Sequence, residues 1–255
     1  MHRLEREQTS ILDKKQAKLD TLRRENVDAY QGVMWLRENR NIFKAPVHDP
    51  IMLTLDVKDK SYARYVETHI GRADLEGFVC EDPDDVNLLT KNLREKLHLR
   101  KINAFHSNPE PAGRFQHPVP SQEMAKYTFQ DYLSNMYSAP EAVNAYLCKQ
   151  KHLHQVPVFR EENRFTGELK NRFQNFYIKD QKFNTRKSRY PPFEVRGVML
   201  EQALTTCYCL SAAVGLYLML CSGEHRHGGY RRKKGDQIGC RGEPGGGRED
   251  LLRVG

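Results

Sequence analysis

The sequence predicts a mixed α/β domain that follows a helical arm and precedes a tail of different composition. Residues 1–40 contain no proline and one glycine, as a continuous helix requires. Between residues 50 and 158, short apolar runs alternate with amphipathic runs, as strands and helices do in α/β domains. Residues 199–255 hold 11 of the 17 glycines and four of the six cysteines. We therefore expect an arm at 1–44, an α/β domain at 45–198, and a poorly ordered or partly helical tail at 199–255.

A heptad pattern runs through the arm. Two columns of positions spaced by seven residues and offset by three form a seam: Leu12, Leu19, Asn26 and Val33, and then Lys15, Leu22, Ala29 and Leu36. Asn26 at an a position is expected to fix the register of a coiled coil, and charges of alternating sign flank the seam. The alternative is a single amphipathic helix that packs on its own domain. Pro46 and Pro50 end the helix after Phe43.

The first half of the α/β domain is expected to alternate strands and helices. The apolar run 51–57 predicts a buried strand, and 62–70 predicts a helix that Gly71 ends. Residues 78–80 predict a short strand, and Asp84 or Asp85 can cap the next helix. The buried face of that helix is expected to consist of Val86, Leu89, Leu93 and Leu97. Residues 102–105 predict a third strand.

The second half begins with a loop and continues with one helix and one strand. Five residues of 107–122 are proline or glycine, so this segment is expected to be an exposed loop. Ser138 and Glu141 fit a capping box before a helix at 142–148. Residues 152–158 predict a strand because their apolar positions alternate.

Basic and aromatic residues are interleaved at 159–190, which suggests contact with nucleic acid. The whole chain carries a net charge of +8, and this stretch alone holds nine Lys or Arg against four acids. Seven aromatic residues lie among them. Cations that neutralise phosphates beside rings that stack on bases suit a single strand. The residues predicted to contact phosphate are Lys170, Arg172, Lys179, Lys182, Arg186, Lys187 and Arg189, and those predicted to stack are Phe173 and Tyr177. The alternative is that the aromatics face the core.

Other classes of function find little support in the sequence. There is no G-x-x-x-x-G-K-[ST] loop and no nucleophile elbow, and no spacing of cysteines and histidines matches a closed zinc site. We therefore expect no catalysis, no cofactor and no metal. Charges at the N-terminus argue against a secretory signal, and the scarcity of cysteine before residue 199 suggests a reducing compartment.

The uncharged stretch 203–223 leaves three interpretations open. Its 21 residues approach the length of a membrane span and are followed by a basic cluster. Hydroxyl and thiol side chains dilute its apolarity. It is a membrane anchor, a helix that packs on the domain, or an unselected read-through sequence.

The ordered segments of the body resemble the hinge region of structural maintenance of chromosomes (SMC) proteins. The resemblance covers about residues 12–198 and rests on the following segments: 35–40 (WLRENR) with Phe43, 50–54 (PIMLT), 62–70 (YARYVETHI), 78–81 (FVCE), 138–143 (SAPEAV), 146–148 (YLC) and 152–158 (HLHQVPV). The resemblance implies an α/β dimerisation domain at one end of a long antiparallel coiled coil.

The resemblance also implies a function and a partner. The domain would pair with the hinge of the sixth SMC protein and contact DNA, preferring single strands, during chromosome repair in the nucleus. Two features depart from the family: the ATPase head motif is missing, and residues 199–255 show no heptads that could supply the returning helix. A truncated product with an incomplete hinge and no function is therefore one alternative, and a protein anchored in a membrane by 203–223 is another.

Overall fold

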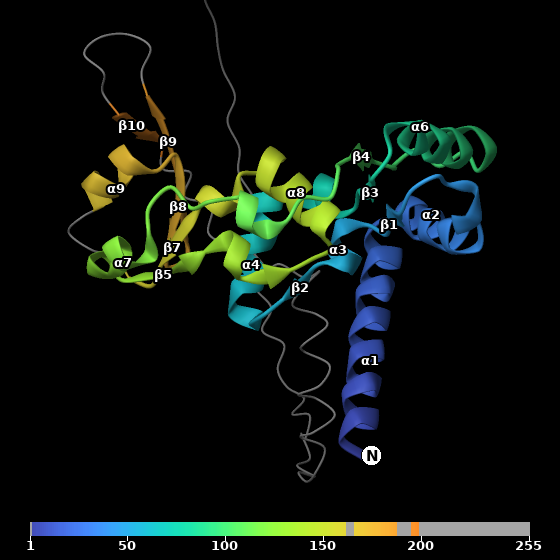
Figure 1. Ribbon diagram of the computed structural model, residues 1–255, viewed down its shortest axis with the longest axis horizontal. Coiled ribbons are helices and arrows are strands. Elements are labelled where there is room, and N and C mark those ends of the chain that lie inside the picture. Colours follow the sequence, from blue (N-terminus) through green and yellow to red (C-terminus); the bar gives the residue numbers. More distant parts are fainter. Residues whose placement is uncertain (1, 162–165, 188–194, 199–255) are drawn as a thin grey trace, which may run out of the picture. The chain divides into compact units, whose positions relative to one another are not determined.

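The computed structural model describes residues 2–161, 166–187 and 195–198 of the chain (Figure 1). All of them belong to the first of two compact units, which spans Met1–Cys221. The predicted tail at 199–255, with its uncharged stretch 203–223, lies outside the described residues, as does Arg189. None of the described helices combines the length with the apolarity that a membrane crossing needs.

The predicted arm is two helices rather than one. Helix α1 (His2–Glu25) ends where Asn26 begins α2 (Val27–Glu38). Asn26 has an extended backbone, and its side chain accepts a hydrogen bond from the backbone N–H of Ala29, as an N-cap does. The prediction that Asn26 sets the register of a continuous coiled coil is therefore wrong, because its carboxamide caps the second helix.

The heptad seam is buried against the domain itself. Its apolar residues from Leu19 onward belong to the main hydrophobic core, and Asn26 is buried among them, whereas Leu12 is 66% exposed. The alternative of an amphipathic helix packed on its own domain is thus correct for residues 19–38. The packing does not mark the boundary between arm and domain that was expected at residue 44, because α2 is part of the core. Whether residues 2–16 pair with another helix stays a prediction.

A three-stranded sheet follows α2, with the strand order β1-β3-β4. Its members are β1 (Val47–His48), β3 (Phe78–Cys80) and β4 (Ala104–His106). β1 pairs antiparallel to β3, and β3 pairs parallel to β4. The predicted strand at 78–80 is confirmed, and the strand predicted at 102–105 begins two residues later. β3 is buried at all three positions, as a central strand requires.

The strand predicted at 51–57 is wrong. Residues Ile51–Thr54 form the short helix α3, and only Asp56–Val57 form a strand, β2. Pro50 precedes α3 with a fixed φ of −45°, and the first turn buries Ile51 and Met52. An apolar run of this length satisfies a buried helical turn as well as a buried strand, so periodicity could not separate the two.

Helices α4 (Lys60–Ile70), α5 (Arg72–Leu75) and α6 (Pro83–Lys91) lie between these strands. The predicted helix at 62–70 is confirmed, and Gly71 ends it with a φ of 85°, which a side chain would strain. Asp82, and not Asp84 or Asp85, caps α6. A π-turn at Asn92–Lys96 extends α6, so the predicted apolar face holds at Leu89 and Leu93 but leaves Leu97 exposed.

The capping box predicted at residues 138–141 does not form. Helix α8 (Glu141–Gln150) begins after Pro140, and no side chain caps it. Ser138 lies instead in β6 (Tyr137–Ser138), which pairs antiparallel to β2. The helix itself is confirmed, and six of its residues, all of them hydrophobic, are buried. Within the predicted loop 107–122, the structure has a 3-10 turn at Ala112–Arg114 and the start of α7 (Ser121–Met124).

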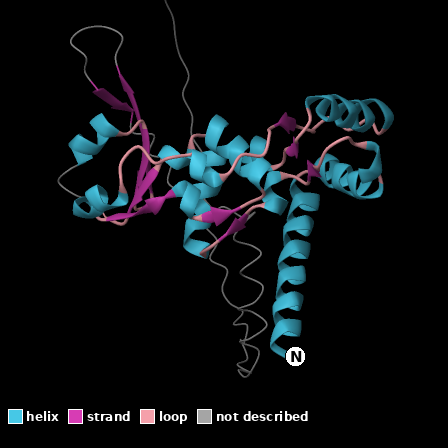
Figure 2. Cartoon of the chain, viewed as in Figure 1, coloured by secondary structure: helices cyan, strands magenta, loops and turns pink. Residues whose placement is uncertain are grey.

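A second sheet, whose strands are drawn in magenta with the others in Figure 2, has the strand order β10-β9-β8-β7-β5. Its strands are β5 (Phe129–Tyr132), β7 (Pro157–Phe159), β8 (Asn175–Ile178), β9 (Gln181–Lys187) and β10 (Val195–Val198), and α9 (Thr166–Arg172) precedes β8. The strand predicted at 152–158 covers β7 only in part, because a 3-10 turn occupies Leu153–Gln155. Further 3-10 turns lie at Arg40–Ile42, Ala125–Tyr127 and Leu133–Asn135.

Two hydrophobic clusters stabilise the described residues. The larger one joins α2, α4, α8 and the three-stranded sheet, and it includes Leu36, Val66, Phe78 and Val143. The smaller one lies against the second sheet and includes Tyr132, Phe159, Phe176 and Phe183. The described residues therefore form the predicted α/β fold around two neighbouring cores.

Candidate nucleic-acid interface

The aromatic residues of the basic stretch 159–190 pack into the protein. The structure describes five of them, and all five are buried: Phe159, Phe173, Phe176, Tyr177 and Phe183. β8 explains why, because it is covered on both faces. Phe176 and Ile178 lie in the smaller cluster, whereas Tyr177 belongs to the larger one. Phe176 stacks on Phe183 of β9 with 4.9 Å between ring centroids.

Phe173 and Tyr177 are unsuited to the predicted stacking on bases. Phe173 is 4% exposed and Tyr177 is 0% exposed, so neither offers a ring face to a ligand. Tyr177 packs edge to face on Tyr65 and on His69 of α4. Tyr177 points inward from β8, and Phe173 is buried in the segment between α9 and β8, which corresponds to the alternative that the aromatics face the core. The interface, as a prediction, now rests on the cations alone.

Two of the predicted cations lie on α9. Lys170 is partly exposed, and its Nζ lies 5.8 Å from the centroid of the Phe183 ring. The Arg172 guanidinium is 3.7 Å from the carboxylate of Glu123 and donates to the hydroxyl of Tyr127 at 3.4 Å. The contacts of both side chains are long, so their N–H groups can still donate hydrogen bonds to the oxygens of a bound phosphate.

Lys179 and Lys182 flank the turn between β8 and β9. Lys179 is exposed in the turn with a φ of 51°, in the left-handed region. Lys182 pairs with Tyr177 across the two strands, so it lies on the face toward α4. Its Nζ is 3.5 Å from the carbonyl oxygen of Thr68. Burial, with the nearby charge of Lys151, lowers the pKa of Lys182.

The surroundings of Lys182 contain more cationic groups than acids. His69 is partly buried beside it, and the resulting loss of solvation, followed by the charge of Lys182, lowers the pKa of His69 to about 4. The Nε2 atom of His69 is 2.9 Å from the carbonyl oxygen of Lys151. Lys151 in turn forms an ion pair with Asp74 at 2.6 Å. The imidazole is therefore held neutral, because loss of solvation, and then repulsion from the charges of Lys182 and Lys151, disfavours its protonated form.

The predicted cations whose side chains are described therefore do not share one surface. Lys170 and Arg172 lie on α9, Lys179 lies in the turn, and Lys182 faces α4. The backbones of Arg186 and Lys187 belong to β9, but their side chains lie outside the described residues, as does all of Arg189. Contact of these seven residues with phosphate remains a prediction.

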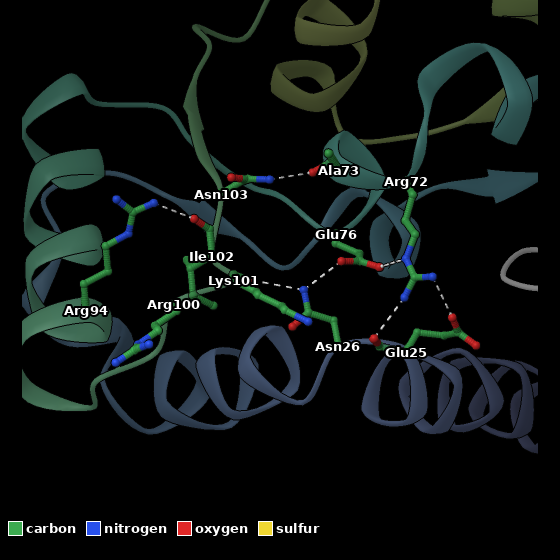
Figure 3. A pocket seen from close by; sticks show the side chains of 10 residues that line it. All are labelled: Glu25, Asn26, Arg72, Ala73, Glu76, Arg94, Arg100, Lys101, Ile102 and Asn103. Atoms are coloured by element: carbon green, nitrogen blue, oxygen red, sulfur yellow. Dashed lines mark hydrogen bonds and ion pairs between the residues drawn. The ribbon is translucent and has the colours of Figure 1, made fainter. Parts of the chain in front are cut away.

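A denser basic segment lies outside the residues predicted from the sequence. Residues 91–101 hold five Lys or Arg and one acid, an excess of four charges in 11 residues. Counting charge in short windows would have found it. Three of its cations, Arg94, Arg100 and Lys101, line a pocket between the start of α2, α5 and residues 100–103 (Figure 3). No group of three or more potential metal ligands occurs among the residues that the structure describes.

Both larger sheets have open edges in the part of the chain that is described. β4 pairs only with β3, and β5 pairs only with β7. An edge strand presents unpaired N–H and C=O groups, which another chain can satisfy. β4 and β5 are therefore two of the edge strands, among those described, to which another strand could pair.

Curated relatives share sequence similarity with this chain over more than half of its length. Structural maintenance of chromosomes protein 5 of Schizosaccharomyces pombe is 24% identical over 139 residues, which are 53% of this chain and 13% of that protein. The Arabidopsis thaliana protein of the same name is 26% identical over 165 residues, 64% of this chain and 15% of the relative. The Caenorhabditis elegans protein is 28% identical over 155 residues, 59% of this chain and 14% of the relative. No family model matches the chain.

A solved structure has the same fold. The crystal structure of the S. pombe Smc5/6 hinge domain matches with a TM-score of 0.68 and 21% identity, over 86% of this chain and 85% of that one. The mixed α/β fold predicted from the sequence is thus the SMC hinge fold. The chain spans about one seventh of the curated relatives, as the matched shares of 13–15% show.

Proposed function

We propose that this chain, which has the SMC hinge fold and is similar in sequence to structural maintenance of chromosomes protein 5, acts as the hinge of such a protein. In this role it pairs with the hinge of structural maintenance of chromosomes protein 6, binds DNA with a preference for single strands, and performs no catalysis. Its place is on chromosomes in the nucleus, in DNA repair and recombination. The observation that carries the proposal is the match of 86% of the chain to the Smc5/6 hinge structure.

The proposed mechanism is mechanical. Two hinges join two coiled-coil arms into one V or ring, and cations at the hinge hold the phosphates of a strand. The open edges of β4 and β5 support the pairing step, because a partner strand can extend either sheet. The exposed cations of α9 and of the β8–β9 turn support the binding step.

Sedimentation velocity tests the pairing. The full chain is mixed with an equal amount of the protein 6 hinge at micromolar concentration, and each protein is also run alone. We expect one species with the mass of a one-to-one complex, and its persistence at high salt would show that the contact is not only electrostatic. Absence of a complex would support the alternative that the chain is a truncated product without this function.

Salt titration of a fluorescent single-stranded oligonucleotide tests DNA binding. The logarithm of the binding constant is expected to fall with the logarithm of salt concentration, by about 0.7 per phosphate that is neutralised. Replacing Lys170, Arg172 and Lys179 by Gln should reduce this slope by about 2. The matched control replaces by Gln three exposed lysines, Lys14, Lys15 and Lys58, which carry the same total charge. A slope of zero for the unmodified chain, or equal slopes for both variants, would remove the basic stretch from the proposal.

A further inference from the structure

A polar pocket of about 580 Å³ lies at the junction of α1 and α2 (Figure 3). Its walls come from the end of α1, from α5, and from residues 100–103. Four cations line it, namely Arg72, Arg94, Arg100 and Lys101, together with two acids, Glu25 and Glu76. No aromatic side chain is among its lining residues. Such a pocket is suited to recognise charge, and it offers nothing on which a base could stack.

Both acids of the pocket are already engaged by other side chains. The guanidinium of Arg72 forms ion pairs with Glu76 at 2.6 Å and with Glu25 at 2.9 Å. The Nδ2 atom of Asn26 donates to the second oxygen of Glu76 at 2.7 Å. The four cations and two carboxylates that line the pocket leave an excess of two positive charges, so the pocket remains positive although Arg72 engages both acids.

The other three cations keep most of their donors. Arg94 uses one guanidinium nitrogen to donate to the carbonyl oxygen of Ile102 at 2.8 Å. Within the described part of the chain, neither the Arg100 guanidinium nor the Lys101 ammonium makes a hydrogen bond or an ion pair, and both residues are exposed. A phosphate oxygen is the partner that a guanidinium fork fits best.

The segment that carries Arg100 and Lys101 is fixed by its own backbone contacts. One carboxylate oxygen of Asp28 accepts the backbone N–H of Arg100 at 2.9 Å and that of Lys101 at 2.8 Å. These bonds lower the pKa of Asp28, so the carboxylate stays ionised and the bonds persist. Asn26 holds the same segment by donating to the carbonyl oxygen of Lys101 at 3.1 Å. The segment therefore needs little ordering when a ligand arrives.

A second cavity shares two of its lining residues with the first. It has a volume of about 480 Å³ and is lined by Arg94, His98, Leu99 and Arg100. Arg94 and Arg100 belong to both cavities, so this pair of arginines stands between two hollows. A ligand with two or more phosphate groups can place one group on each side of the pair.

We propose that Arg94, Arg100 and Lys101 form a binding site for linked phosphate groups, separate from the basic stretch at 159–190. The ligand is a chain of phosphates or phosphodiesters that is recognised through its oxygens and not through bases. Such groups come either from a small polyphosphate or from the backbone of a nucleic-acid strand. The site does not depend on the proposed function, since it needs neither the partner hinge nor the residues of α9.

Isothermal titration of the full chain with pyrophosphate at low ionic strength tests the site. The test variant carries Arg100→Gln and Lys101→Gln, whose side chains hold no other part of the fold in place. The matched control carries Lys14→Gln and Lys15→Gln, which remove the same charge from exposed positions of α1. We expect the test variant to weaken binding by about tenfold or more, and the control to change it by less than about twofold. Circular dichroism confirms that both variants fold.

A second arm of the experiment identifies the source of the phosphates. A fluorescent single-stranded oligonucleotide is titrated into the same three proteins, and pyrophosphate is then added as a competitor. Weaker oligonucleotide binding by the test variant supports a nucleic-acid strand as the source. An effect on pyrophosphate alone supports a small polyphosphate. If the two variants behave alike toward both probes, the site is overturned, and this result leaves the test on α9 unaffected.

Discussion

Asn26 shows how one side chain can determine a junction. Its oxygen caps α2 by accepting the N–H of Ala29 at 3.0 Å. Its nitrogen donates to Glu76 and to the carbonyl oxygen of Lys101, which belong to two further segments. The sequence places Asn26 in a hydrophobic seam, where an amide was expected to face a second polar group across a coiled coil. The amide does find polar partners, but they come from its own domain.

His69 makes the stability of the domain depend on pH. Its burial, and then the charge of Lys182, lowers its pKa from 6.5 to about 4 in the folded protein. The unfolded chain therefore binds a proton more readily between these two pH values. The stabilising contribution is complete above about pH 6.5 and is lost as the pH falls toward 4. We expect the free energy of unfolding to fall by about 2 kcal/mol from this group between pH 7 and pH 5.

Urea unfolding at both pH values measures this effect. His69→Gln removes the titrating group while it keeps hydrogen-bonding capacity toward the carbonyl oxygen of Lys151. The variant should therefore show a smaller loss of stability between pH 7 and pH 5 than the unmodified chain. His106→Gln, at an exposed position of β4, serves as the control and should leave the loss unchanged. Equal losses in all three proteins would contradict the assignment to His69.

At the scale of elements, α1 is attached to the domain by a buried cation. Lys18 is 5% exposed and donates to the carbonyl oxygen of Leu55 at 2.6 Å and to Asp56 at 2.9 Å. Lys18→Met keeps the apolar stem but leaves that carbonyl oxygen without its donor. We expect a loss of about 1–2 kcal/mol in the free energy of unfolding. Amide hydrogen exchange should also rise in residues 18–24 before it rises in the sheets.

Lys15→Met provides the control for this prediction. Lys15 lies one turn earlier on the same helix, and its side chain is exposed. It should alter neither the stability by more than about 0.5 kcal/mol nor the exchange of α1. If both substitutions had the same small effect, Lys18 would not anchor the helix.

The close approach of β3 and β4 depends on Gly77. A methyl group at this position would overlap the ring of Phe105. That ring cannot swing away freely, since it stacks on Tyr146 with 4.6 Å between centroids. Gly77→Ala is expected to lower the free energy of unfolding by about 1–3 kcal/mol, measured by urea denaturation. Gly113→Ala is the control, because nothing lies within 4 Å of the added methyl group. A stable Gly77→Ala variant would mean that the two strands can separate at little cost.

Local signals predicted those elements that carry a signal of their own. The sequence of the helix at Lys60–Ile70 shows both an apolar face and a glycine at its end, and in the structure that face is buried and the glycine has a positive φ. The strand predicted at 51–57 had only its apolarity, which a buried helical turn shares. Ser138 had the spacing of a capping residue, but pairing with β2 placed it in a strand. Tertiary contacts determined the secondary structure of these segments, and such contacts do not follow from the residue pattern of a single sequence.

The candidate site was likewise predictable from the sequence only in part. The density of cations at 159–190 was visible, but the direction of each side chain was not. Tyr177 faces α4 because β8 lies between two clusters, an arrangement that depends on strand order. The pocket near Arg100 escaped notice because its residues come from three separate segments, which only the fold brings together.

At the scale of the whole molecule, β8 links the two hydrophobic clusters. Tyr177 contributes to the larger cluster, while Phe176 and Ile178 contribute to the smaller one. Loss of this strand would expose apolar surface on both sides. The described domain is therefore expected to unfold in one cooperative transition.

Shortened chains test this cooperativity. A chain that ends after residue 198 retains every member of both clusters, which lie between Leu19 and Phe183. We expect its urea midpoint to equal that of the full chain. A chain that ends after residue 174 lacks β8 and β9, and it should show no cooperative transition. A lower midpoint for the longer of the two fragments would mean that residues beyond 198 contribute to the stability of the domain.

The joint at Asn26 has a mechanical consequence. Two contacts hold α1 against the domain. Lys18 donates to the carbonyl oxygen of Leu55, just before β2, and Arg72 forms an ion pair with Glu25. We therefore expect a rotation of α1 to move α5, which is followed after Gly77 by β3, the central strand of the three-stranded sheet. Under the proposed function, we expect such a movement to change the open edge at β4, where a partner strand can pair.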